Sequence, residues 1–266
     1  MENSRQVTRD SDIEQSIRSA YETEGVYKVD SICHRLNEQS ADYVDRLLLE
    51  KLKTVRRHAV EGLLVDLCCA TGEHLFSLAD VSHDCLGIDF SRPYIDKANA
   101  LSFDNGLNHV KFEVGDAKKI PLATGSVSTL YSFSALYAIP CVDAVISEIS
   151  RVLRKGGHCV LDLGNSRSLN SICVRAYTEL PPTFHISVPE MYQICTQNDL
   201  QIVEHRSFQL LPLWADRPNW LWPLLHPAWK KVMAARYKGK MIDEWISSLP
   251  MLRNFAFRHL IVCRKL

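Results

Sequence analysis

The chain has 266 residues, of which 46% are apolar, and it carries 31 basic and 31 acidic side chains. This composition supports a globular fold with a large buried core. The balanced charge leaves no surplus of cations to neutralise a row of phosphates, so nucleic acid is not an expected partner. No apolar run approaches the roughly 20 residues that cross a bilayer, and the first thirty residues are charged, so we expect a cytoplasmic protein without a transmembrane segment.

The nine cysteines are scattered along the chain, and no pair has C-x-x-C spacing. Their odd number and irregular spacing favour reduced thiols in a cytosolic setting. We therefore expect neither a disulfide framework nor a metal site.

Hydrophobic patterning predicts helices over residues 11–58 and then an alternation of strands and helices. The expected strands cover residues 63–67, 85–90, 110–114, 126–134, 158–164, 201–211 and 255–265. Helices are expected over residues 74–81, 92–103, 142–157 and 188–200. Alternation of this kind predicts a doubly wound α/β fold with a parallel sheet.

The pattern also predicts how the chain is divided. Residues 1–58 are expected to form a helical N-terminal cap on a single domain of residues 59–266. Residues 212–250 differ from the rest because they hold all five tryptophans and most of the late prolines. We expect them to form an aromatic-rich insertion before the last strand.

Three acids stand at or just after the first three expected strands, where ligands of open parallel sheets bind. Asp89 presents two acceptor oxygens to the vicinal hydroxyls of a ribose. Asp116 is placed to accept from an adenine amino group, while the backbone N–H of Ala117 donates to the ring. Asp66 lies near the expected amino-acid end of the ligand, and the turn of small residues that follows it, up to Gly72, allows close approach of the backbone.

The stretches VDLCCATGE, GIDFS and GDAKKIPL resemble, in order and spacing, the motifs of class I S-adenosylmethionine (SAM)-dependent methyltransferases. The likeness is greatest to the C-methyltransferases of ubiquinone and menaquinone biosynthesis, and ISEISRVLRKGGHCVLDLGN extends it to residue 165. The resemblance implies a Rossmann-like, mostly parallel seven-stranded sheet with an antiparallel last strand, and SAM as cofactor with S-adenosylhomocysteine as product. It also implies that residues 66–72 hold the methionine part, Asp89 the ribose, and Asp116 with Ala117 the adenine.

The implied cofactor site includes further residues: Tyr21, Tyr27, Cys68, Ala70, Phe90 and Phe133. The two tyrosines would close over the cofactor from the cap. Cys68 and Ala70 depart from the family pattern, which has glycine at both positions. If residue 70 adopts positive φ, its methyl group should weaken SAM binding by about 1 kcal/mol or more.

The acceptor is expected to be a small, largely apolar metabolite, methylated on oxygen, carbon or nitrogen. Tyr137 lies where the family lines the space between cofactor and acceptor. Tyr137 and His185 are the candidates for taking a proton, which only a hydroxyl or acidic-carbon acceptor requires. Trp214, Trp220 and Trp222 are expected to line the acceptor pocket, the alternative being that they only bury the insertion.

Two other functions fit part of the pattern. A nicotinamide-dependent oxidoreductase also has an acid after its second strand, but residues 66–74 offer one glycine where a pyrophosphate needs several free backbone N–H groups. A SAM-binding protein that has lost catalysis is the second alternative, since methyl transfer depends more on alignment than on one essential side chain. The oligomeric state stays open.

Overall fold

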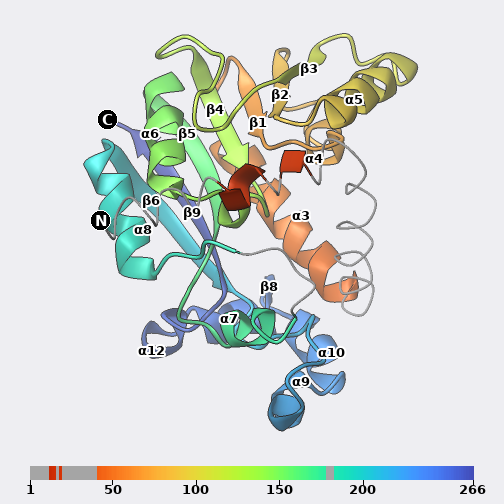
Figure 1. The fold of residues 1–266 in the computed structure, drawn as a ribbon, viewed down its shortest axis with the longest axis vertical. Helices are drawn as coiled ribbons and strands as arrows, with labels where there is room; N and C mark the ends of the chain where they lie inside the picture. The colour runs from red at the N-terminus through yellow and green to blue at the C-terminus, as the bar shows by residue number, and fades with distance from the viewer. Residues whose placement is uncertain (1–11, 16–17, 20–40, 178–182) are drawn as a thin grey trace.

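The computed structural model describes residues 12–15, 18–19, 41–177 and 183–266 (Figure 1). A seven-stranded sheet forms its centre, in the order β3-β2-β1-β4-β5-β9-β6. Only β9 runs antiparallel to its neighbours in this sheet. The strands are β1 Leu64–Leu67, β2 Cys85–Asp89, β3 Val110–Val114, β4 Val127–Ser132, β5 Leu153–Gly164, β6 Leu200–Phe208 and β9 Arg258–Lys265. The predicted fold class, a Rossmann-like sheet with an antiparallel last strand, is confirmed.

Helices cover both faces of this sheet, and further short elements fill the insertion (Figure 1). Those before the insertion are α3 Ala41–His58, α4 Glu73–Phe76, α5 Arg92–Asp104, η1 Leu136–Ala138, α6 Val142–Val152, α7 Leu169–Val174 and α8 Val188–Gln197. The later ones are η2 Asn219–Leu221, α9 Trp222–Leu225, α10 Ala228–Ala234, α11 Ile242–Ser247 and α12 Pro250–Arg253, with a β7 Arg236–Tyr237 and β8 Lys240–Met241 hairpin between α10 and α11.

Three predicted helices end earlier than expected, among them α8, which ends at Gln197 rather than at residue 200. Helix α4 ends at Phe76 rather than at residue 81, because the backbone N–H groups of Leu78 and Ala79 bond to carbonyls three residues back, which tightens the chain into turns. Helix α6 ends at Val152, because Leu153 already pairs with Val127 of β4.

Alternate residues of each central strand enter two separate cores. Leu64 of β1 and Leu260 of β9 pack with residues of α3, α4 and α5, whereas Val65 and Ile261 pack with α6 and α8. This alternation is the ordinary consequence of the two-residue period of a strand buried on both faces. Side chains that share the parity of Leu64 and Leu260 therefore point toward α3.

No helix in the described part of the chain is long and apolar enough to span a bilayer.

Two histidines form a continuous hydrogen-bonded chain between β6 and β9. His259 Nε2 lies 3.0 Å from the Ala256 carbonyl, so it donates, and His259 Nδ1 lies 2.7 Å from His205 Nε2, which must then donate to it. His205 Nδ1 is left to accept from the Tyr192 hydroxyl at 2.9 Å and from the Arg253 guanidinium. This arrangement needs both rings neutral, and burial lowers the pKa of His259 to about 4 and that of His205 to about 3.

The histidine pair should make the protein less stable in mild acid. Below the usual histidine pKa of about 6.5 the unfolded chain takes up protons that the folded pair refuses, so unfolding becomes easier as the pH falls toward about 4. Each neutral ring adds up to about 1.4 kcal/mol per pH unit to this slope. Urea titrations from pH 7 to pH 4.5 should show a slope shallower by about 2 kcal/mol per unit in the His205→Gln, His259→Gln double variant. Equal slopes in the two proteins would contradict neutral rings.

Candidate active site

The turn after β1 has a backbone conformation that favours glycine. Cys68, Ala70 and Gly72 have φ values of 64°, 47° and 82°, all in the left-handed region. A Cβ atom at Gly72 would lie 2.4 Å from Cζ of Phe112, so that position also has no room for a side chain. The alternating left-handed residues bend the chain back toward β2, where the N–H groups of Cys68 and Cys69 both donate to the Ile88 carbonyl.

Ala70→Gly should raise the free energy of unfolding by about 0.5–1 kcal/mol, because glycine adopts this φ without the steric cost that the methyl group incurs. Ala98→Gly in α5 is the matched control, and it should lower stability by about 1 kcal/mol because glycine weakens a helix interior. Denaturant titrations measure both changes. A loss of stability in Ala70→Gly would show that position 70 is not strained.

Cys68 and Cys69 are not candidates for thiolate chemistry. Burial, together with the nearby carboxylates of Asp66 and Asp89, raises the pKa of both thiols far above neutrality. The thiols are therefore protonated and act as small apolar side chains within the turn.

Asp66 is a buried carboxylate at the end of β1 with one oxygen left unpaired. Its side chain is almost fully enclosed, and its Oδ2 has no hydrogen-bond partner. Burial raises the pKa of Asp66 well above its usual range. A buried acceptor of this kind is costly unless it gains a donor. The hydroxyl of Tyr131, buried nearby, opposes the rise in the pKa of Asp66, and the ammonium group of an amino acid would supply a further donor.

Asp89 ends β2, directly beside the β1 turn. Its two carboxylate oxygens accept from the backbone N–H groups of Ala70 at 3.0 Å and Ser91 at 2.9 Å. Burial raises the pKa of Asp89, while these N–H groups oppose the shift. Since each carboxylate oxygen can accept a second hydrogen bond, Asp89 retains the capacity to bind two hydroxyls.

Asp116 follows β3, and the side chain of Arg18 ion-pairs with it. The Arg18 guanidinium also lies 5.0 Å from the ring centre of Phe90, the residue after Asp89. Asp116 Oδ1 accepts from the Lys118 backbone N–H at 2.8 Å, and Ala117 is buried beside it. The described N-terminal residues, red in Figure 1, therefore contact the region predicted to hold adenine. Arg18 was not predicted from the sequence.

Phe133, just after β4, and Tyr137 in η1 flank a second group of side chains. Tyr137 lies 5.7 Å from the His185 ring, centre to centre, and 5.0 Å from the Arg258 guanidinium. Burial and Arg258 lower the pKa of His185 to about 4, and its Nε2 is buried without a hydrogen-bond partner. The structure thus brings the two predicted proton acceptors together, with His185 neutral at physiological pH.

Sequence reasoning missed a buried charged cluster beside them. Lys51 Nζ of α3 lies 2.6 Å from Oδ2 of Asp162, and Nη1 of Arg258 lies 3.4 Å from the same oxygen. Burial opposes ionisation of Asp162, but the two cations hold its pKa at about 2. Burial lowers the pKa of Lys51. The sequence offered one signal. In α3, β5 and β9 a charged residue stands at a position that the helical periodicity or the strand alternation predicts to be buried.

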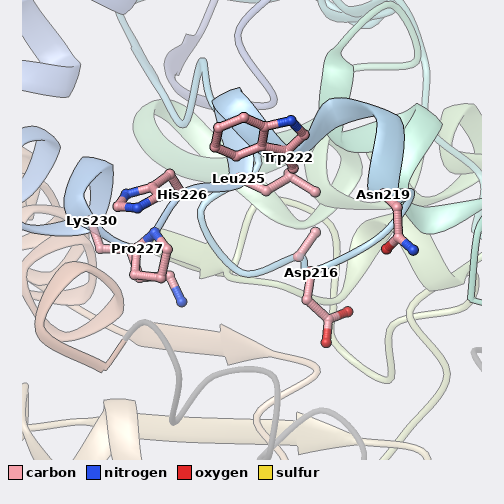
Figure 2. A pocket seen from close by; sticks show the side chains of 8 residues that line it. Asp216, Asn219, Trp222, Leu225, His226, Pro227 and Lys230 are labelled. Atoms are coloured by element: carbon pink, nitrogen blue, oxygen red, sulfur yellow. The ribbon is translucent and has the colours of Figure 1, made fainter.

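The predicted tryptophans do not form one wall. Trp214 packs against the Tyr177 ring at 5.3 Å between ring centres, and its Nε1 donates to Asn170, as expected of a residue that buries the insertion. Trp222 lies on a pocket of about 500 Å³ but is 64% exposed, and Trp220 is 68% exposed. The pocket lies within the insertion and is lined by Ala215, Asp216, Asn219, Trp222, Leu225, His226, Pro227 and Lys230 (Figure 2). A role of these tryptophans in acceptor binding stays a prediction. Tyr21 and Tyr27 lie outside the described residues.

A family model described as "Methyltransferase domain" matches residues 61–234, which is more than half of the chain. The chain belongs to this methyltransferase family. The resemblance expected from the motifs, and the enzyme class it implied, are confirmed at this level. The matched range begins just before β1 and includes the acids and the turn described above.

Individual relatives agree with this membership. The demethylmenaquinone methyltransferase of Lactococcus lactis is 32% identical over 117 residues, which are 42% of this chain and 46% of the relative. The first relatives matched are covered to 46%, 43% and 32% of their own lengths, so the chain spans less than half of each.

Solved structures resemble the fold. A geranyl diphosphate C-methyltransferase from Streptomyces coelicolor, solved with S-adenosylhomocysteine, has a TM-score of 0.56 at 18% identity, covering 82% of this chain and 77% of the other. The [4+2]-cyclase SpnF has a TM-score of 0.55 at 17% identity, covering 80% and 79%. At these identities the likeness shows the fold alone, and the cyclase shows that the fold is not restricted to one reaction.

Proposed function

We propose that this protein binds SAM and transfers its methyl group to a small, largely apolar metabolite. The observation that carries the proposal is the arrangement at the carboxyl ends of β1 and β2, where an unpaired buried carboxylate, a left-handed turn of small residues and a second carboxylate meet. We also propose that residues 59–266 form the catalytic domain with the insertion 212–250, and that residues 1–58 form its cap.

The residues present fit SAM group by group. Asp66 offers its unpaired oxygen to the ammonium of the methionine part, and the turn from Cys68 to Gly72 keeps side chains out of the way. Asp89 offers acceptor capacity to the ribose hydroxyls, and Asp116 with Ala117 offers an acceptor and a donor to the adenine. Phe90, directly after Asp89, and Phe133, directly after β4, supply apolar surface to the site. Bound SAM would supply a methyl group already activated by its sulfonium.

The work left to the protein is alignment and exclusion of water. Tyr137, which follows β4, packs against His185, which follows β5, and we assign this pair to the acceptor side of the site. There they can orient an acceptor. If the acceptor loses a proton from a hydroxyl, the unpaired Nε2 of neutral His185 is the atom we assign to receive it.

The same geometry argues against the oxidoreductase. Asp66 and Asp89 place buried carboxylates on both sides of the turn, where a pyrophosphate would be repelled. Only the formation of a methylated product distinguishes the enzyme from a protein that binds SAM without catalysis.

Incubation with methyl-labelled SAM and pooled small metabolites tests the proposal. We expect label to appear in a small apolar product, whose mass spectrum locates the added methyl. Absence of labelled product from every pool, in a protein that binds SAM, would support the non-catalytic alternative.

A further inference from the structure

The cluster of Lys51, Asp162 and Arg258 has one more positive than negative charge. Lys51 is 6% exposed and Asp162 is fully buried. Asp162 and Arg258 are the charged groups that act most on Lys51, and the nearby His74 is neutral at physiological pH because burial and Lys51 lower its pKa to about 4. Two cations therefore share one carboxylate in a nearly water-free place, and a surplus charge there is costly unless a ligand compensates it.

The hydrogen bonds to the Asp162 carboxylate from the described residues all go to one of its two oxygens. Asp162 Oδ2 accepts from Lys51 at 2.6 Å, from the Ser134 backbone N–H at 3.2 Å and from Arg258 at 3.4 Å. Its other oxygen, Oδ1, is buried and has no partner. A ligand that balances this cluster would thus present an anionic oxygen to the cations and a hydroxyl donor to Oδ1.

Aromatic rings surround the two cations. The Arg258 guanidinium lies 4.8 Å from the Phe257 ring centre and 5.0 Å from that of Tyr137. Lys51 Nζ lies 5.5 Å from the ring centre of Phe133. These rings form apolar surface around a fixed positive charge, which suits a flat conjugated ligand with one ionised group.

The cluster is buried, but it borders the proposed active site through residues that reach the surface. Ser134, which bonds to both Lys51 and Asp162, is exposed, and Tyr137 is half-buried. Both follow β4, next to β1 in the sheet, so the cluster faces the same end of the sheet as Asp66 and Asp89.

We propose that Lys51 and Arg258 bind the methyl acceptor through a single anionic oxygen group, a carboxylate or an ionised phenol or enol on a conjugated ring, and that Asp162 accepts from a neighbouring hydroxyl. This inference rests on the proposed function, because it names the acceptor class of that active site. A single surplus charge fits a monoanion and does not fit a diphosphate.

Probe binding to the intact chain tests the proposal. Saturated with S-adenosylhomocysteine, the wild type should bind 3-hydroxybenzoate more tightly than benzoate, and benzamide, the neutral isostere of benzoate, should bind at least about tenfold more weakly than benzoate. Lys51→Met, which leaves the cluster neutral, should lose about tenfold in benzoate affinity. Lys53→Met is the matched control, since this lysine is exposed two residues away on the same helix, and it should bind as the wild type does.

Asp162→Asn separates a ligand site from a structural ion cluster. It raises the surplus charge by one, so benzoate should bind more tightly and raise the melting temperature more than in the wild type, while the preference for 3-hydroxybenzoate should shrink. A purely structural cluster would make both Lys51→Met and Asp162→Asn less stable without opposite changes in benzoate affinity, and that result would overturn the proposal. Equal binding of benzoate and benzamide would do the same.

Calorimetry with S-adenosylhomocysteine alone distinguishes this proposal from the proposed function. No binding of S-adenosylhomocysteine would contradict the proposed function, whereas its binding without binding of the anions would contradict only the acceptor class.

Discussion

Asp243→Ala should lower the free energy of unfolding by about 3–5 kcal/mol, because several buried donors lose their acceptor at once. The Asp243 carboxylate accepts from the Tyr43 hydroxyl, from the backbone N–H groups of Gln209 and Leu210, and from the Ser247 hydroxyl. It thereby ties α3, the end of β6 and α11 together. Denaturant titration measures the change.

Two variants make the Asp243 result specific. Asp243→Asn keeps one acceptor oxygen and should fall between alanine and the wild type. Asp45→Ala removes an exposed carboxylate from α3 and should change stability by less than about 0.5 kcal/mol. A loss below about 1 kcal/mol in Asp243→Ala would show that water replaces these contacts and that the network does not hold the insertion in place.

Asp89→Ala should weaken SAM binding by about 2 kcal/mol or more, roughly a thirtyfold rise in Kd, since both ribose hydroxyls lose a charged acceptor. Asp104→Ala, at the exposed end of α5, is the control and should bind SAM as the wild type does. Isothermal calorimetry measures both, and thermal melting reports whether the loss of the Ala70 and Ser91 hydrogen bonds unfolds the turn. Unchanged affinity in a folded Asp89→Ala protein would remove Asp89 from the site.

The sheet was predictable because its strands are short apolar runs between helices with clear periodicity. Strands β1 and β2 are buried along their whole length, as continuous apolar runs of parallel sheets are. The ends of α4 and α6 were not predictable. After α4 the backbone N–H groups bond to carbonyls three residues back instead of four, and after α6 Leu153 pairs with β4 instead of extending the helix. The helix propensities of these residues do not determine where either helix ends.

The candidate site was predictable only where its residues follow strands in order. Asp66, Asp89 and Asp116 stand in that relation, and the structure places them along one end of the sheet. The Lys51 cluster was not predictable in the same way, because its partners lie 111 and 96 positions apart and meet only through packing of α3 on β5 and β9. The alternation of β5 and β9 and the periodicity of α3 place Lys51, Asp162 and Arg258 between α3 and the sheet. No single segment of the sequence shows that these three side chains meet.

Calorimetric titration of the unmodified chain with SAM, and in parallel with NAD, tests the central claim most directly. We expect a single SAM site with a micromolar or tighter Kd and no heat from NAD. Binding of NAD without binding of SAM would contradict the assignment of Asp66, Asp89 and the β1 turn to a SAM site.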